Sequence, residues 1–195
     1  MNTITEVISR IGLALERERI PEELIRWPLV EPRYELIEGR LYMVPAPTLD
    51  HQRAVRELEH ALHRFVFTHH LGEVFFAPCE VRLSELDTVQ PDIFFVSMAR
   101  RSILGEKQVE GTPDLIVEVV SPSTEQWDRV VKRKLYAQYG VREYWLVDLK
   151  ARQAEVLTLK GEDYERAGLY DEGETLRSPL LPGLEIELSQ VFTKP

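Results

Sequence analysis

Apolar positions recur along the chain with two different periods, and each period predicts a type of element. Spacings of three and four residues over 3–19 and 51–70 predict two amphipathic helices, the second capped by Asp50. Alternating or continuous apolar runs between turn residues predict strands over 34–37, 41–44, 73–83, 90–96, 114–120 and 143–147. A third helix is expected over 124–139, with Gly140 in the place of a C-terminal helix glycine.

The order of these elements predicts the fold class. The run strand–helix–strand over 114–147 is a crossover unit, so its two strands should be parallel with a right-handed connection. The tail over 153–188 predicts short strands, followed by a short helix at 188–192. We therefore expect an α/β domain over 33–195, with a central mixed sheet, flanking helices and a β-rich C-terminal extension. Prolines separate this domain from an N-terminal helical arm over 1–32.

Composition narrows the class of protein. The chain has 195 residues, of which 44% are apolar and 29% charged, as in ordinary globular domains. No apolar run approaches the roughly 18 residues of a membrane span, and the N-terminus lacks the features of a signal peptide. We expect a cytoplasmic protein without membrane contact. The single cysteine, Cys79, excludes an intramolecular disulfide and is typical of a small buried apolar residue.

Two carboxylates interrupt apolar strands and are the candidate chemical groups. Glu118 lies inside the run 114–120, and Asp92 directly precedes the apolar part of 90–96. A buried carboxylate needs a partner, a proton or a metal, and Mg²⁺ prefers carboxylate, carbonyl and water oxygens. Asp114 is an alternative ligand, but it lies about 13 Å along the strand from Glu118, too far to share one ion with it. A buried ion pair is the alternative role for Glu118.

A lysine on the following helix completes the candidate cluster. Asp128, Lys132 and Tyr136 are spaced by four residues and therefore share one helical face. If that face turns toward the strand ends, the ammonium of Lys132 can orient a water molecule and offset charge on a phosphate. Lys134 is the rival lysine, but it points about 200° away around the helix. A solvated position paired with Asp128 is the alternative role for Lys132.

The five histidines also invite a metal hypothesis. His60 and His63 could share a helix face, but the sequence has no second ligand pair or cysteine motif of a structural zinc site. His51, at the start of a predicted helix, is either a capping or surface residue or a group close to the cleft.

These residues are part of a larger pattern that resembles the PD-(D/E)XK nuclease superfamily. More closely, the sequence is similar to a restriction endonuclease family first catalogued as a domain of unknown function. The resemblance covers roughly 30 to 190 and is carried by Tyr34 to Gly39, His51, Pro91-Asp92, Pro113 to Thr124, Asp128, Lys132, Tyr136 and Gly140 to Asp148. One departure is that the superfamily lysine, two residues after the second acid, is replaced here by Val120.

The resemblance implies a restriction-endonuclease-like core, a divalent metal and phosphodiester hydrolysis. It implies that Asp92 and Glu118 bind the metal, and that Lys132 takes the place of the displaced lysine. It also places Glu38 close to the site. With the main-chain carbonyl of Val119 as a further ligand, the expected protein is an endonuclease that cuts DNA with Mg²⁺ or Mn²⁺. A homodimer is expected, because cutting both strands of a duplex requires two sites.

Two further functions remain open from the sequence. A non-catalytic binding or scaffold protein with the nuclease fold is favoured by Val120 and by the net charge of -9, which argues against a long electrostatic footprint on nucleic acid. Clustered carboxylates that hold cations also raise the negative count, so the charge does not exclude a nuclease. The third possibility is a hydrolase of another phosphate ester that uses the same metal site.

Overall fold

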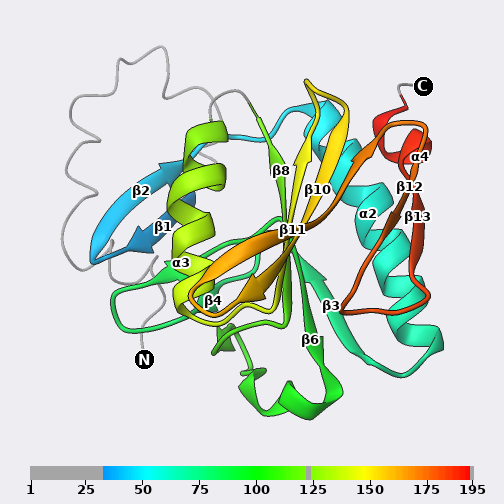
Figure 1. Cartoon of the computed structure of the whole chain (residues 1–195). Helices are drawn as coiled ribbons and strands as arrows, with labels where there is room; N and C mark the ends of the chain where they lie inside the picture. Colours follow the sequence, from blue (N-terminus) through cyan, green and yellow to red (C-terminus); the bar gives the residue numbers. More distant parts are fainter. Residues whose placement is uncertain (1–32, 122–123, 194–195) are drawn as a thin grey trace, which may run out of the picture.

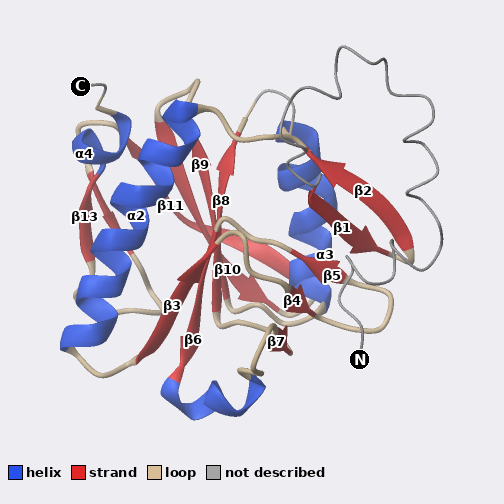
Figure 2. Cartoon of the chain, turned by 180° about the vertical axis from the view of Figure 1, so that it is seen from behind, coloured by secondary structure: helices blue, strands red, loops and turns tan. Residues whose placement is uncertain are grey.

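The structure is a computed structural model that describes residues 33–121 and 124–193. The predicted N-terminal arm, including the helix over 3–19, lies outside the described residues. Most of the domain is built around a mixed six-stranded sheet with helices on both faces (Figures 1 and 2). The predicted α/β class is therefore confirmed. Within the described ranges, no helix has both the length and the apolar content needed to cross a membrane.

The six-stranded sheet carries the predicted crossover. In spatial order its strands are β11 (Asp163–Asp171), β10 (Gln153–Lys160), β9 (Glu143–Asp148), β8 (Leu115–Val120), β6 (Ile93–Ser97) and β3 (Gly72–Phe76). Strands β8 and β9 are parallel, as predicted, and the other neighbours are antiparallel.

The alternation of side chains along β8 assigns the two faces of this sheet. Leu115, Val117 and Val119 pack in the core formed with α2 (Leu49–Thr68) and α4 (Leu188–Phe192). Ile116 and Val120 pack in a second core that includes α3 (Arg133–Gln138). Figure 1 shows α2 and α3 on opposite sides of the sheet. Because side chains alternate with period two, Glu118 faces the α3 side.

A second, five-stranded sheet lies beside α3. Its order is β2 (Arg40–Val44), β1 (Arg33–Ile37), β5 (Thr88–Val89), β4 (Val81–Arg82) and β7 (Val109–Glu110). The predicted hairpin is confirmed, since β1 pairs with β2 around Glu38 and Gly39, whose φ angles are 51° and 73°. Two consecutive positive φ angles are typical of tight hairpin turns, and they favour glycine. Figures 1 and 2 both show this hairpin next to α3.

Further short elements lie outside the two large sheets. They are the 3₁₀ helix η2 (Met98–Ile103) and the two-stranded sheet of β12 (Thr175–Arg177) and β13 (Glu185–Glu187). The terminal helix α4 agrees with the prediction and packs beside α2. Strands β10 and β11 contain 8 and 9 residues, so the prediction of only short strands in this tail is wrong.

Three predicted boundaries are corrected. The run 73–83 is not one strand, because β3 and β4 belong to different sheets and Pro78, which has no N–H to donate, lies between them. The run 90–96 begins as a strand only at Ile93, so Asp92 precedes the ladder. Helix α2 begins at Leu49, and its cap is Thr48 rather than Asp50: the Thr48 side chain accepts a hydrogen bond from the His51 N–H at 3.2 Å.

The helix predicted over 124–139 is not a uniform α-helix. A π-helical segment, η3 (Trp127–Lys132), precedes α3. Gly140 follows α3 with φ 77°, which confirms its predicted place at the helix C-terminus.

Candidate active site

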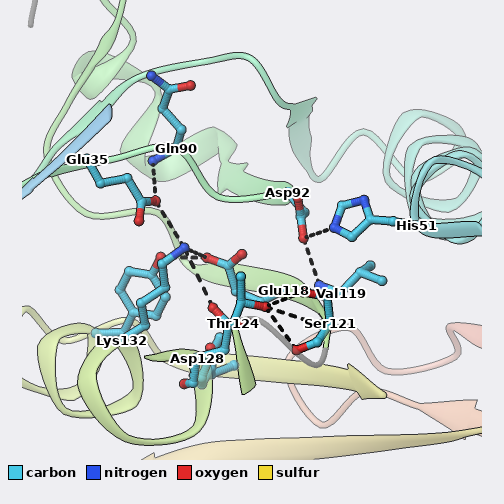
Figure 3. A network of polar contacts seen from close by, with 12 residues as sticks. Glu35, His51, Gln90, Asp92, Glu118, Val119, Ser121, Thr124, Asp128 and Lys132 are labelled. Atoms are coloured by element: carbon cyan, nitrogen blue, oxygen red, sulfur yellow. Dashed lines mark hydrogen bonds and ion pairs between the residues drawn. The ribbon is translucent and has the colours of Figure 1, made fainter. Parts of the chain in front are cut away.

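Lys132 is the centre of a buried polar cluster. Its Nζ lies 3.0 Å from Oε1 of Glu118, and the two side chains are 7% and 4% exposed. Figure 3 shows the ammonium directed at this carboxylate. Lys134, the rival lysine, is exposed. The structure thus brings together Glu118 on β8 and Lys132 on η3, as the sequence hypothesis requires.

The π-helical segment and α3 supply two further groups. Tyr136 donates a hydrogen bond from its hydroxyl to Oε1 of Glu118 at 2.8 Å, and Oδ1 of Asp128 lies 3.8 Å from Nζ of Lys132. The predicted sharing of one helical face by these residues is therefore confirmed. The π-helical turn itself was not foreseen, and such turns are frequent at functional sites.

Glu35 is a cluster member that sequence reasoning missed. Its Oε1 lies 3.0 Å from Nζ of Lys132 and accepts a hydrogen bond from the Gln90 N–H, also at 3.0 Å. Glu35 is 2% exposed and comes from β1, in the other sheet. One signal was available: Glu35 and Ile37 are two positions apart on a strand and so share its buried face.

Glu38, the acid that the resemblance places near the site, lies elsewhere. It is exposed in the hairpin turn, and its backbone N–H donates to Oδ1 of Asp87 at 2.8 Å. The contacts of the described residues thus place Glu35, rather than Glu38, in the Lys132 cluster.

Asp92 lies where the ladder between β6 and β8 stops. The last pair of this ladder is Ile93 with Val117, and the N–H of Val119 donates instead to Oδ2 of Asp92 at 2.8 Å. The N–H and carbonyl of one strand residue point to the same edge, so the Val119 carbonyl is also directed to this side. His51 Nε2 lies 3.0 Å from the same carboxylate oxygen. Figure 3 shows Asp92 held between His51 and Val119.

The cluster contains more negative than positive charge. Burial raises the pKa of Glu118 well above its ordinary value; Lys132 opposes this shift, whereas Asp92 and other nearby carboxylates add to it. Burial also raises the pKa of Asp128, to about 6, against the attraction of Lys132. Burial alone would lower the pKa of Lys132, but the neighbouring carboxylates outweigh it and raise that pKa. Three carboxylates, those of Glu35, Glu118 and Asp128, thus lie within 4 Å of one ammonium, an excess of negative charge that a bound cation would offset.

The donor atoms fit an oxygen-ligated cation. Asp92, Glu118 and the Val119 carbonyl provide hard oxygen ligands of the kind that Mg²⁺ and Mn²⁺ prefer. Oδ1 of Asp92 and Oε2 of Glu118 accept no hydrogen bond from a described residue. Among residues 33–121 and 124–193, however, no three His, Cys, Asp or Glu side chains are arranged as a ready metal cage. These residues would therefore supply only some of the ligands of a bound Mg²⁺, and water molecules would supply the others.

Asp114, the alternative ligand, has different partners. Its Oδ2 accepts a hydrogen bond from the Ser97 N–H at 2.8 Å, and Oδ1 lies 3.5 Å from Arg142 Nη1 and 3.9 Å from Arg100 Nη1. It is 1% exposed. Asp114 directly precedes β8, and its partners are different residues from those of the Lys132 cluster.

Comparisons with known proteins agree with this architecture. The family described as "Putative restriction endonuclease" (Uma2) matches residues 21–189. A crystal structure described as "a putative nuclease belonging to DUF820 from Anabaena variabilis ATCC 29413" superimposes with a TM-score of 0.70 and 19% identity, covering 88% of this chain and 96% of that one. At this identity the match demonstrates a shared fold. No curated protein matches the sequence.

Proposed function

The chain belongs to the Uma2 family, whose description is "Putative restriction endonuclease". On this premise we propose that it is a metal-dependent endonuclease that hydrolyses DNA phosphodiester bonds. One observation carries the proposal. The ammonium of Lys132 lies 3.0 Å from the carboxylate of Glu118, and the backbone N–H of the next residue, Val119, donates a hydrogen bond to Asp92. Two acids and a lysine converging in this way suit phosphoryl chemistry better than a purely structural role.

In the proposed mechanism the cation is Mg²⁺ or Mn²⁺, held by Asp92, Glu118 and the Val119 carbonyl. When bound, such a cation lowers the pKa of a coordinated water and stabilises charge on a phosphate. Lys132 orients the attacking water and offsets the negative charge that develops on the phosphate oxygens. We also expect a cytoplasmic homodimer, in which two clusters could act on the two strands of a duplex.

The remaining contacts position these groups. Glu35 and Tyr136 fix the directions of Lys132 and Glu118, respectively, through contacts of 3.0 and 2.8 Å. His51 contacts Oδ2 of Asp92, which leaves the second carboxylate oxygen for the cation. Neighbours of this kind hold ligands in one orientation, and their loss typically costs 10- to 100-fold in metal affinity or activity.

DNA cleavage with Mg²⁺ or Mn²⁺ tests the proposal. Supercoiled plasmid and circular single-stranded DNA are incubated with the full chain and with the variants Asp92→Asn, Glu118→Gln and Lys132→Met. We expect cleavage by the wild type that chelators abolish and that each variant loses. Variants that fold and cut as fast as the wild type would disprove the mechanism.

A scaffold protein with a nuclease fold is the second candidate. The net charge of -9 favours it, as does the missing three-residue metal cage among the described residues. Calorimetric titration with Mn²⁺ separates the two candidates. A nuclease should bind Mn²⁺ with heat that disappears in Glu118→Gln, whereas a folded wild type without any such heat would support the scaffold. Metal binding with cleavage of a small phosphodiester but not of DNA would instead indicate another phosphate ester as substrate.

A further inference from the structure

Two aromatic rings lie beside the Lys132 cluster. Tyr42 is directly opposite Glu35 in the ladder between β1 and β2, and opposed residues of an antiparallel pair place their side chains on the same face. Trp127 directly precedes Asp128 in the π-helical segment. The centroids of the two rings are 4.3 Å apart and their planes are inclined by 49°. Tyr42 is thus the cross-strand neighbour of Glu35, and Trp127 is the chain neighbour of Asp128. Both of these acids contact Lys132.

The rings are only partly covered by protein. Tyr42 and Trp127 both pack at the margin of the core on the α3 side, and both retain partial exposure. The molecule therefore presents a partly exposed pair of aromatic rings next to its candidate reactive groups.

The two arginines that flank Lys132 on η3 and α3 are already paired with acids, whereas Lys134 is exposed. Arg129 pairs with Asp148 at 2.7 Å, and Arg133 pairs with Asp163 at 3.2 Å. The whole chain has a net charge of -9. A duplex offers proteins mainly its phosphates, because the faces of its bases are stacked inside. An unpaired strand instead exposes base faces, which stack on aromatic side chains.

We propose that Tyr42 and Trp127 form a stacking subsite for an unpaired base, and that the polynucleotide bound at this site is single-stranded or locally unpaired. The inference rests on the proposed function for its chemistry and adds the class of substrate. A strand stacked on the ring pair would run beside Lys132, and each protomer of the proposed homodimer could cut such a strand on its own.

The test is equilibrium binding, which needs no turnover. Fluorescence anisotropy of a labelled oligothymidine and of a labelled duplex of equal length is measured with the full chain in Ca²⁺, at one fixed salt concentration. We expect tighter binding of the single strand. Stacking is worth about 1–3 kcal/mol per base, so Trp127→Ala should weaken single-strand binding by roughly 5- to 150-fold. Trp127→Phe, which keeps an aromatic face, should lose less.

Two further variants keep the result interpretable. Trp127→Leu retains apolar packing but lacks an aromatic face, so it replaces Trp127→Ala if that variant does not fold. Phe67→Ala removes a 69% exposed ring at the far end of α2 from His51 and should bind like the wild type. Equal or tighter binding of the duplex, no binding of either form, or wild-type binding by folded Trp127→Leu would each overturn the inference.

The same samples distinguish this inference from the proposed nuclease. Single-strand binding that depends on Trp127, without any cleavage in Mn²⁺, would support the stacking subsite and count against the nuclease. Cleavage in Mn²⁺ that is faster on duplex DNA and unaffected by Trp127→Leu would support the nuclease and overturn the stacking subsite.

Discussion

One buried acid directly precedes strand β8 and another lies in its second half, and the two differ in how their charge is compensated. The first, Asp114, accepts a backbone hydrogen bond and lies within 4 Å of two arginines. The second, Glu118, shares a single lysine with further carboxylates, and burial raises its pKa. Burial alone therefore does not identify a reactive acid. An excess of negative charge without enough positive partners identifies a reactive acid better, because a stable fold does not require such an excess.

The largest expected difference between the two acids concerns cleavage. We expect Glu118→Gln to lower the DNA cleavage rate by roughly 10²- to 10³-fold, because one preorganised electrostatic group is removed. Asp114→Asn should lower stability but leave cleavage unchanged. Gel assays in Mn²⁺ with both variants, after circular dichroism to verify folding, make the measurement. Loss of cleavage in a folded Asp114→Asn variant would reverse the assignment of the two acids.

Burial of the Asp128 carboxyl group, with a smaller effect of the neighbouring carboxylates, also predicts a pH dependence of stability. The pKa of Asp128 is raised from 3.8 to about 6, so the folded state binds this proton more tightly than the unfolded state. Stability therefore falls as pH rises from 3.8 to about 6, by up to about 3 kcal/mol in free energy of unfolding. Urea unfolding of the metal-free protein across this window should show the fall, and Asp128→Asn should flatten it. An equal slope in both proteins would contradict the raised pKa of Asp128.

Glu35 tests whether the second sheet contributes to the site. Glu35→Gln can still accept the hydrogen bond from the Gln90 N–H but removes the charge opposite Lys132. We expect cleavage to slow by roughly 10- to 100-fold, as for other residues that orient a reactive group. The matched control is Glu38→Gln in the same hairpin, where the side chain is exposed. Similar rates for the two variants would remove Glu35 from the site.

The smallest effect is expected at the rival lysine. Lys134 is exposed two positions after Lys132, so Lys134→Ala should change the free energy of unfolding by less than about 0.5 kcal/mol and leave cleavage intact. Thermal melting and the same gel assay suffice. A cleavage defect as large as that of Lys132→Met would indicate that the wrong face of the helix has been assigned.

Local patterns predicted the elements that position the cluster. The apolar run of β8 interrupted by Glu118, the following helix and β9 define a parallel crossover that the structure confirms. The four-residue spacing of Asp128, Lys132 and Tyr136 gave their shared face correctly, because a helix face is set by neighbours in sequence. The catalytic roles of these residues remain predictions.

The features that sequence reasoning missed depend on distant pairing. The run 73–83 divides between two sheets, and nothing in its own residues specifies the partners of β4. The inward direction of the Glu35 side chain could be deduced from the alternation of side chains along a strand. Its contact with Lys132, however, depends on how β1 packs against η3. The π-helical segment spans only the 6 residues Trp127–Lys132, too few for their apolar spacing to distinguish its period from that of an α-helix.

The contact of Glu35 with Lys132 has a consequence for biogenesis. These side chains come from opposite halves of the chain, one from strand β1 and the other from the helical segment η3, so the contact closes a long loop and forms only when β1 has packed against η3. A nascent chain that has released β1 but not η3 from the ribosome has an acid without its lysine. Any hydrolytic activity that depends on this pair therefore begins only after most of the domain has been synthesised. A truncated product that lacks η3 would have no such activity.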